Sequence, residues 1–256
     1  MTLGGFTMVR NGILLDYPYA LAIKSMLPFC DQVVVSDCES TDGTKEHLLS
    51  WAADEPKLKV VSHEWTDPRG AGGTWFPEWI NATRKHLTTD WVCYLDADEC
   101  WADDAGVKIR AAAESRKAVM CHRLNFWRDA QHLCPHGENC GFEVIRVGPQ
   151  GLDFPSDSPT PQSSTIERLA QRDLSIQIMH YGFLRRRDAM FRKAREVLRI
   201  WANSYDPRME KVENSDPTKN WMEQIEGVPW INRLLPFNGT HPQIAHQWLR
   251  DRGFNP

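Results

Sequence analysis

The stretch "WVCYLDADEC", residues 91–100, starts as a buried strand and ends in acidic residues. Its first half is apolar or aromatic and suits the interior of a β-sheet. Asp96, Asp98 and Glu99 then follow within four positions. Three carboxylates this close repel one another unless a cation or exposure to water relieves the repulsion. The stretch therefore predicts a strand whose carboxyl end carries a charged site.

Strand and helix patterns alternate before this stretch. Strands are expected at 5–9, 32–37 and 57–65, and helices at 17–29, 42–53 and 75–87. This order predicts an α/β fold with a mostly parallel sheet and helices on both faces. In such sheets ligands bind beyond the carboxyl ends of the strands. Asp37 closes the second strand and Asp96 follows the fourth, so both acids are expected at one edge of the sheet.

The pattern after residue 115 is less regular. Strands are expected at 118–127, 142–148 and 174–184, and a loop with a short helix at 236–253. An amphipathic helix is expected at 187–202, because apolar residues recur there at helical spacing. Its outer face is predicted to carry Arg192, Lys193, Arg195 and Arg199. No linker separates two domains, so we expect one domain.

Composition places the chain among globular proteins. It has 256 residues, 41% of them hydrophobic and 25% charged, and a net charge of −4. The charge excludes a protein that is cationic throughout, although basic residues concentrate from Arg185 to Arg199. The first residues lack the pattern of a signal peptide, and no apolar run approaches the roughly 20 residues that span a bilayer. We therefore expect a cytoplasmic protein.

The seven cysteines are expected to be thiols, because nothing in the sequence indicates export. One cluster differs from the others: "HLCPHGENC" contains His132, Cys134, His136 and Cys140. These are zinc-ligand residue types, but their spacing matches none of the common zinc patterns. A structural zinc site and an ordinary polar loop both remain open, and the polar loop is favoured.

Two motifs mark the strand ends. "VVVSDCESTDGT" at 33–44 is followed by "YLDADE" at 94–99. Together they resemble the family 2 glycosyltransferases of GT-A fold, whose first signature reads V-D-D-G-S-T-D-G-T. Asp37 and 40–44 match it, Cys38 and Glu39 replace its second Asp and its Gly, and residues 96–98 form the second signature, Asp-X-Asp. The resemblance is clear over residues 5–105; later, "HYGF" and "FNGTHP" look like landmarks of a bacterial and phage subgroup.

The resemblance implies a nucleotide-sugar donor, a UDP-sugar by first expectation, with Mn²⁺ or Mg²⁺ bridging its phosphates. Asp98 is then the expected direct metal ligand, and Asp96 is expected to bind the donor ribose, a metal-bound water or the metal itself. Asp37 is expected at the nucleobase, where a carboxylate favours the N3–H of uracil. His180 has the chemistry of a further metal ligand, or it is an ordinary core histidine.

Other candidates depend on less specific signals. Arg10 is expected to contact base or phosphate, or to be a surface arginine. Arg185 is expected to bind the diphosphate, or to start a solvated helix. Transfer with inversion, which the resemblance implies, needs a general base. Asp157 is the first choice and Asp153 the second, although an Asp in "PSDSP" is also an ordinary turn residue.

A single GT-A domain over 1–256 is the expected organisation. Residues 1–115 would form the nucleotide-sugar-binding half, and 116–256 an acceptor-side half with a helical C-terminal part. The acceptor is expected to be either a saccharide or glycoconjugate, or a 5-hydroxymethylpyrimidine in phage DNA. In the second case the enzyme would be phage-encoded and would act in the host cytoplasm. The alternative is a catalytically inactive nucleotide-sugar-binding protein of the same fold, which the presence of both Asp96 and Asp98 does not favour.

Overall fold

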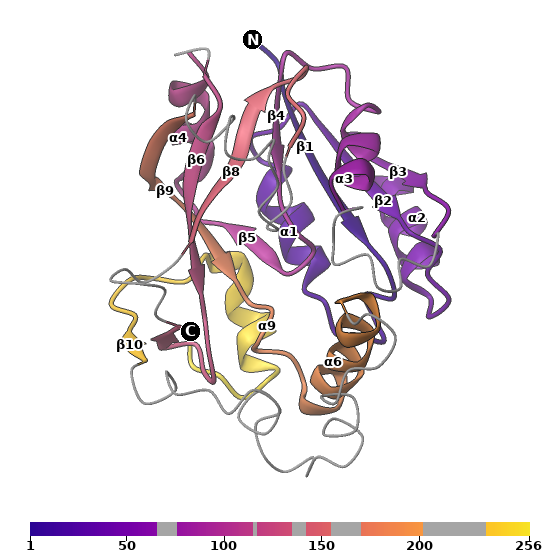
Figure 1. Ribbon diagram of the computed structural model, residues 1–256, viewed down its shortest axis with the longest axis vertical. Helices are drawn as coiled ribbons and strands as arrows, with labels where there is room; N and C mark the ends of the chain where they lie inside the picture. Colours follow the sequence, from indigo (N-terminus) through magenta and orange to yellow (C-terminus); the bar gives the residue numbers. More distant parts are fainter. Residues whose placement is uncertain (66–75, 115–116, 135–141, 155–169, 202–233) are drawn as a thin grey trace.

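The computed structural model describes residues 1–65, 76–114, 117–134, 142–154, 170–201 and 234–256 (Figure 1). The first part of the chain forms the parallel strands β1 (Leu3–Val9), β2 (Gln32–Asp37), β3 (Leu58–Ser62) and β4 (Trp91–Tyr94), in the order β3-β2-β1-β4. They are connected through α1 (Tyr19–Met26), α2 (Thr44–Asp54) and α3 (Phe76–Arg84). The predicted alternation of strand and helix is therefore confirmed for this part.

The second part extends the same sheet. After β4 come β8 (Phe142–Pro149), β6 (Val119–Asn125), β9 (Gln171–His180) and β5 (Glu99–Trp101). The pairs β4–β8, β8–β6 and β9–β5 are antiparallel, while β6–β9 is parallel. The sheet is therefore parallel in its first half and mixed in its second. A short antiparallel pair, β7 (His132–Leu133) and β10 (Leu235–Pro236), lies outside it.

The described residues form four further helices, α4 (Ala105–Ala113), α6 (Arg187–Trp201), the 3-10 turn η2 (Gln243–Ala245) and α9 (His246–Arg250). Helix α6 begins where the sequence predicts, whereas β5 and α4 were not predicted. Strand β5 escapes the pattern because it is short and starts with an acidic residue, a type that strands disfavour. None of the helices within the described ranges is long and apolar enough to cross a membrane.

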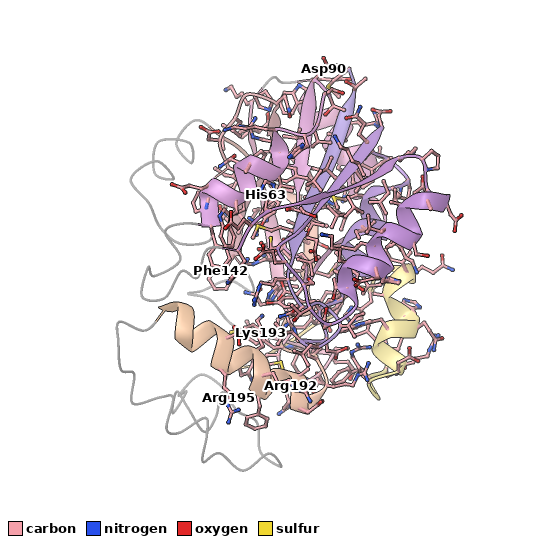
Figure 2. The ribbon with its side chains drawn as sticks, turned by 90° about the vertical axis from the view of Figure 1, so that its right-hand side faces the viewer. His63, Asp90, Phe142, Arg192, Lys193 and Arg195 are labelled. Atoms are coloured by element: carbon pink, nitrogen blue, oxygen red, sulfur yellow. The ribbon has the colours of Figure 1, made fainter. Side chains whose placement is uncertain are left out.

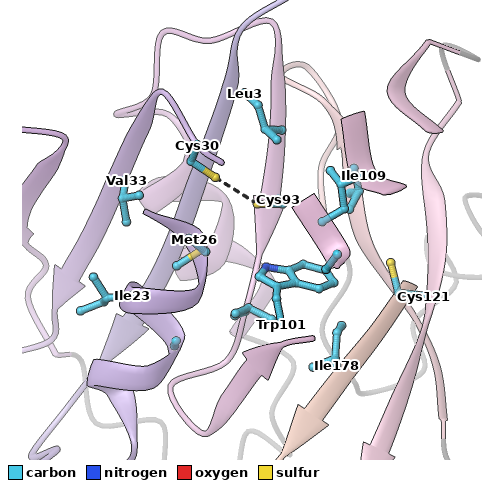
Figure 3. Packing of buried hydrophobic residues seen from close by; sticks show 14 of the residues in the cluster. Leu3, Ile23, Met26, Cys30, Val33, Cys93, Trp101, Ile109, Cys121 and Ile178 are labelled. Carbon is cyan, nitrogen blue, oxygen red and sulfur yellow. Dashed lines mark hydrogen bonds between the residues drawn. The ribbon is translucent and has the colours of Figure 1, made fainter. Parts of the chain in front are cut away.

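Helices cover both faces of the sheet, as predicted, because successive residues of a strand point to opposite sides. On one face Leu3 of β1 belongs to a core with α1 and α4, of which Figure 3 shows Ile23, Trp101 and Ile109. On the other face Phe6 of β1 belongs to a core that includes Ile80 of α3. Strands β1, β2 and β4 are thus buried on both sides. We call the edge at their carboxyl ends the accessible edge, because ligands of such sheets bind there.

The cysteines in the described ranges are free thiols. Cys30 and Cys93 lie in the larger core with their sulfur atoms 3.7 Å apart, as Figure 3 shows. Burial raises the pKa of Cys93 well above its usual value and that of Cys100 to about 12. These groups therefore stay protonated and pack as small apolar residues.

The C-terminal segment is tied to the loop after β1. The Arg252 guanidinium forms an ion pair with Asp16, and its Nε donates to Oδ2 of the same carboxylate at 3.1 Å. The backbone N–H of Arg186 donates to Asp16 as well, at 2.7 Å. Asp16 has φ of 50°, in the left-handed region, and is buried. One carboxylate thus joins the loop after β1, the start of α6 and the end of α9.

Candidate functional site

The loops that follow β1 and β2 form one side of the accessible edge. The N–H of Asn11 donates to Ser40 Oγ at 2.9 Å, and Asn11 Oδ1 accepts from the N–H of Thr41 at 2.9 Å. Asp42 Oδ2 accepts from the N–H of Leu14 at 2.6 Å. The short polar side chains of "STDGT" therefore fasten the two loops to each other.

The same signature starts α2. Asp42 Oδ1 accepts from the N–H of Thr44 at 3.0 Å, which satisfies a donor in the first turn. Gly43 has φ of 92°, a conformation that favours glycine. Glu39, which stands where the resembled signature has Gly, has φ of 53°. A glycine adopts this left-handed backbone conformation without steric cost, which suits the glycine that the signature has at this position.

Asp37 and Arg10 lie at the ends of β2 and β1. Asp37 is fully buried; its Oδ2 accepts from the N–H of Ser40 at 3.2 Å, and its Oδ1 has no hydrogen-bond partner among the described residues. A buried carboxylate oxygen without a donor is costly, so it suits a ligand that brings an N–H group. The Arg10 guanidinium lies 4.5 Å from the ring centroid of Trp65, a residue of the segment that follows β3.

The turn at 96–99, which we call the acidic turn, is held by arginines from β6 and β8. The fully buried Glu99 carboxylate accepts from Arg123 Nη1 at 3.2 Å and from Arg146 Nη2 at 3.0 Å. Its other oxygen accepts from Arg146 Nε at 3.2 Å and from the N–H of Asp96 at 2.9 Å. Glu99 therefore shapes the backbone of the turn and does not face a ligand.

Asp96 is the most accessible carboxylate of the acidic turn. Its Oδ2 accepts from Arg146 Nη2 at 2.7 Å, and its Oδ1 accepts from the hydroxyl of Tyr94. Burial, and then the charge of Asp96, raise the pKa of Tyr94 well above its usual value, so the phenol remains a donor. With its side chain 32% exposed, Asp96 keeps an open side toward solvent.

Asp98 is buried among basic groups. Its Oδ2 pairs with Arg185 and, at 3.0 Å, with Lys193 Nζ; its Oδ1 lies 3.6 Å from His180 Nε2. Burial alone would raise the pKa of this carboxyl, but the charges of Lys193, His180 and Arg185 outweigh it, and the pKa lies well below its usual value. Asp98 is therefore ionised at neutral pH.

His180 reaches Asp98 through strand pairing. Glu99 of β5 pairs with His180 of β9, and the N–H of Tyr181 donates to the Asp98 carbonyl at 2.8 Å. Next to them Gly182 approaches so closely that a Cβ would lie 2.6 Å from His180 Nε2 and 2.8 Å from Asp98 Oδ2. The "HYGF" motif thus supplies an imidazole and the space that it needs.

The donor atoms at Asp98 and His180 fit a divalent cation that is completed by a ligand. A carboxylate oxygen and an imidazole nitrogen 3.6 Å apart can bind one ion, and Mn²⁺ and Mg²⁺ accept such donors. Within the described ranges, no three His, Cys, Asp or Glu side chains gather as a metal site. Asp98 and His180 are therefore the two side chains of the described ranges that could hold a cation here.

Other predicted site residues lie elsewhere. Asp153 is 77% exposed and pairs with Arg84 at 2.8 Å, beyond the end of β8 that neighbours the start of β4. The structure therefore does not bring it to the acidic turn. Asp157 lies outside the described residues.

The possible zinc cluster is described only in part. His132 Nδ1 lies 2.7 Å from Asp129, and the Cys134 N–H donates to the Asn125 carbonyl at 2.9 Å. His136 and Cys140 are outside the described residues.

The predicted outward position of Lys193 is wrong. It lies three and four positions after Met190 and Ala189, which are buried, so it shares their side of α6. Figure 2 shows Lys193 on the side of the helix that faces the body of the molecule and Arg195 on the side that faces away. Arg192 and Arg195 are exposed, as predicted.

Sequence reasoning also missed the arginines that hold the acidic turn. Arg123 and Arg146 each interrupt an apolar strand, in "VMCHRLN" and "FEVIRVG". A charged residue inside such a strand is rarely buried without a partner. That signal indicates a buried acid nearby, although it does not say which one.

A family model described as "Glycosyl transferase family 2" matches residues 22–190. This range contains both signatures and ends just beyond the Asp98 partners His180 and Arg185. No protein of curated function matches the chain in sequence.

Solved structures of two proteins are similar to this chain. TarS of S. aureus, residues 1–349, is 12% identical with a TM-score of 0.48, over 91% of this chain and 74% of that one. The structure of the same protein in complex with UDP-GlcNAc is 13% identical with a TM-score of 0.49, over 83% of this chain and 70% of that one. The mannosyltransferase PcManGT from Pyrobaculum calidifontis, with GDP-Man and Mn²⁺, is 18% identical with a TM-score of 0.46, over 82% and 68%.

Proposed function

Since the chain belongs to glycosyl transferase family 2, we propose that it moves a sugar from a UDP-sugar to an acceptor hydroxyl, with inversion and with Mn²⁺ or Mg²⁺. The observation that carries the proposal is the convergence of Asp98 and His180 at the edge where Asp37 ends β2. Asp37 Oδ1 is a buried acceptor for the base, and the Asp98–His180 pair suits the diphosphate cation. Residues 1–115 then form the nucleotide-sugar half and 116–256 the acceptor half.

Each side chain has a stated role in this proposal. Asp98 and His180 hold the cation, which supplies positive charge to the leaving diphosphate when it is bound. Asp96, on the exposed side of the turn, binds the donor ribose or a water of the cation. Asp37 accepts from the base. Arg10 lies over the ring of Trp65, whose backbone N–H donates to Glu39 of the loop after β2 at 3.2 Å, and is proposed to contact base or phosphate.

The general base is proposed to be an acid of the segment after β8. Asp157 is the candidate there. The placement of Asp153, which is paired with Arg84 away from the acidic turn, gives it no support for that role. Inversion requires the base to take the proton of the acceptor hydroxyl as that oxygen attacks the anomeric carbon.

Two acceptor classes remain in the proposal, and we place saccharides first. A hydroxymethylpyrimidine in DNA needs contacts to phosphates, which the exposed Arg192 and Arg195 of α6 would supply. Because Lys193 turns inward and Arg192 pairs with Asp188 at 2.9 Å, that helix offers fewer cations to DNA than its sequence suggests. We also propose a cytoplasmic location, which the thiol state of the described cysteines supports.

The test is transfer of labelled sugar from a panel of nucleotide-sugars with Mn²⁺. The acceptors are saccharides, DNA with 5-hydroxymethylcytosine and unmodified DNA. We expect donor consumption that stops with EDTA, and a loss of about 100-fold or more in Asp98→Asn. The control Asp104→Asn removes an ion pair with Lys108, at 2.6 Å, and should keep full turnover. Donor that stays intact with every nucleotide-sugar would refute the proposal, and near-normal turnover of Asp98→Asn would refute the metal assignment.

A further inference from the structure

Lys193 belongs to the donor site by geometry, although it lies on a helix whose other described cations face outward. Its Nζ is 3.0 Å from Asp98 Oδ2, and its side chain is only 17% exposed. Figure 1 shows α6 beyond the carboxyl ends of β1 and β2. The helix therefore brings an ammonium group to the edge where the acidic turn lies.

Asp98 thus has two cationic partners on a single oxygen. Arg185 and Lys193 both contact Oδ2, while one carboxylate carries one negative charge. Two cations held this close repel each other, and the carboxylate compensates only one of them. The group of three has one positive charge in excess, which a second anion would relieve.

The two cations differ in their freedom to move. The side chain of Arg185 is fully buried, donates to the Leu15 carbonyl at 3.1 Å and stacks on the ring of Tyr17 at 3.6 Å. These contacts fix its guanidinium whether or not Asp98 has another partner. Lys193 keeps some exposure and is joined to the site through a flexible four-carbon stem. Arg185 is therefore the permanent counter-ion of Asp98, and Lys193 is the cation that can change partners.

We propose that Lys193 binds the diphosphate of the donor, and that its contact with Asp98 is where the ammonium rests when no donor is bound. This inference rests on the proposed function and adds a residue of α6 to it. Asp98 Oδ1 and His180 would hold a cation that supplies positive charge to a diphosphate, and the ammonium of Lys193 lies next to them on Oδ2. The diphosphate leaving group gains negative charge as the glycosidic bond breaks. A positively charged hydrogen-bond donor beside it stabilises that charge and lowers the activation barrier of the transfer.

The experiment compares nucleoside diphosphate with monophosphate. The wild-type protein is screened by calorimetry, with Mn²⁺, against UDP, GDP, CDP, ADP and dTDP; the nucleotide that binds is then paired with its monophosphate. Lys193→Met, which keeps the length of the stem, should weaken the diphosphate about 10- to 100-fold. The affinity for the monophosphate should fall by a factor about tenfold smaller, and Lys193→Arg, which keeps a charged hydrogen-bond donor for phosphate, should restore most of the diphosphate affinity.

The control is Lys108→Met on α4. Lys108 also pairs with an aspartate, Asp104, at 2.6 Å, so this variant removes a lysine and an ion pair away from the site. It should bind both nucleotides as wild type does. Melting temperatures of both variants show whether Lys193 only anchors α6.

Each other result overturns the inference. If Lys193→Met binds the diphosphate as tightly as wild type does, the proposed contact between Lys193 and the diphosphate does not exist. An equal loss for both nucleotides, together with a lower melting temperature, identifies Lys193 as a structural anchor. A wild-type protein that binds none of the nucleoside diphosphates refutes the proposed function, and this inference with it; the first two results leave the proposed function standing.

Discussion

The two sides of the accessible edge are built by different means. The loops after β1 and β2 are joined by hydrogen bonds between backbone groups and short polar side chains about 30 residues apart. The acidic turn is held by ion pairs with Arg123, Arg146, Arg185 and Lys193, which are 24 to 95 residues away in the chain. The contacts that join the two loops to each other are local hydrogen bonds; the turn is held by ion pairs from β6, from β8, and from α6 with the segment that leads into it.

The difference shows how stability is distributed at the edge. A hydrogen bond in a loop can be replaced by water at modest cost when it is lost. A buried ion pair cannot, because removing one partner leaves a charge in a medium that solvates it poorly. The acidic turn should therefore be sensitive to single substitutions, and the loops tolerant of them.

The largest expected effect comes from Glu99→Gln. This change removes the negative charge that Arg123 and Arg146 share inside the sheet, and should lower the free energy of unfolding by about 3–5 kcal/mol. Urea unfolding followed by circular dichroism measures it. The control is Glu143→Gln, whose partner Arg172 is exposed, and it should cost less than about 1 kcal/mol. Equal costs for the two variants would contradict the contrast between buried and exposed pairs.

A smaller effect is expected for Gly182→Ala. The added Cβ would lie within 3 Å of His180 Nε2 and Asp98 Oδ2, and overpacking of this kind costs about 1–3 kcal/mol. Calorimetric titration with Mn²⁺ should show weaker binding in addition, because the Asp98–His180 pair must separate. Gly151→Ala is the matched control, since no atom lies within 4 Å of its Cβ position. Unchanged stability and Mn²⁺ affinity in Gly182→Ala would show that the acidic turn and His180 move apart at little cost to make room for the added Cβ.

The smallest effect is expected for Asp42→Ala in the loops. Asp42 accepts from Leu14 and from the first turn of α2, and the loss of such an acceptor at a helix start costs about 1 kcal/mol. Asp54→Ala, at the other end of α2, should cost nothing, because an acid near a helix C-terminus is unfavourable.

The same variant has a defined pH dependence. Although burial raises the pKa of Asp42, its hydrogen bonds with Leu14 and Thr44 outweigh this and hold the pKa below the usual 3.8. The stabilisation is therefore complete above that value and disappears as the pH falls through the lowered pKa. Thermal melts of wild type and Asp42→Ala should converge in acid; a constant difference between them would exclude the charge of Asp42 as the cause.

The loops could be predicted from sequence because their partners are near neighbours. "STDGT" carries the Asp42 acceptor for the first turn of its own helix and the Gly43 that starts it, and alternating strands place Asp37 and Asp96 at one edge. The fold of the first half follows from the same local patterns.

The partners of the acidic turn could not be predicted in the same way. Arg123 and Arg146 reach Glu99 only through the order β8-β6-β9-β5, which depends on pairing between distant strands. Lys193 was misplaced because helical periodicity gives a face to each residue but does not state which face meets a buried acid. A charged residue inside an apolar segment indicates that it has a buried partner, but the sequence does not show which residue that partner is.

The Asp16–Arg252 ion pair can form only late in the synthesis of the chain. The two residues are 236 positions apart, and at about 5–20 residues per second the ribosome needs roughly 10–50 s to pass from one to the other. During that interval Asp16 lacks its ion pair with Arg252, and the loop after β1 lacks its anchor to the end of the chain that follows α9. The nascent first half can form its parallel strands early, but this corner of the protein is completed only after residue 252 has left the exit tunnel.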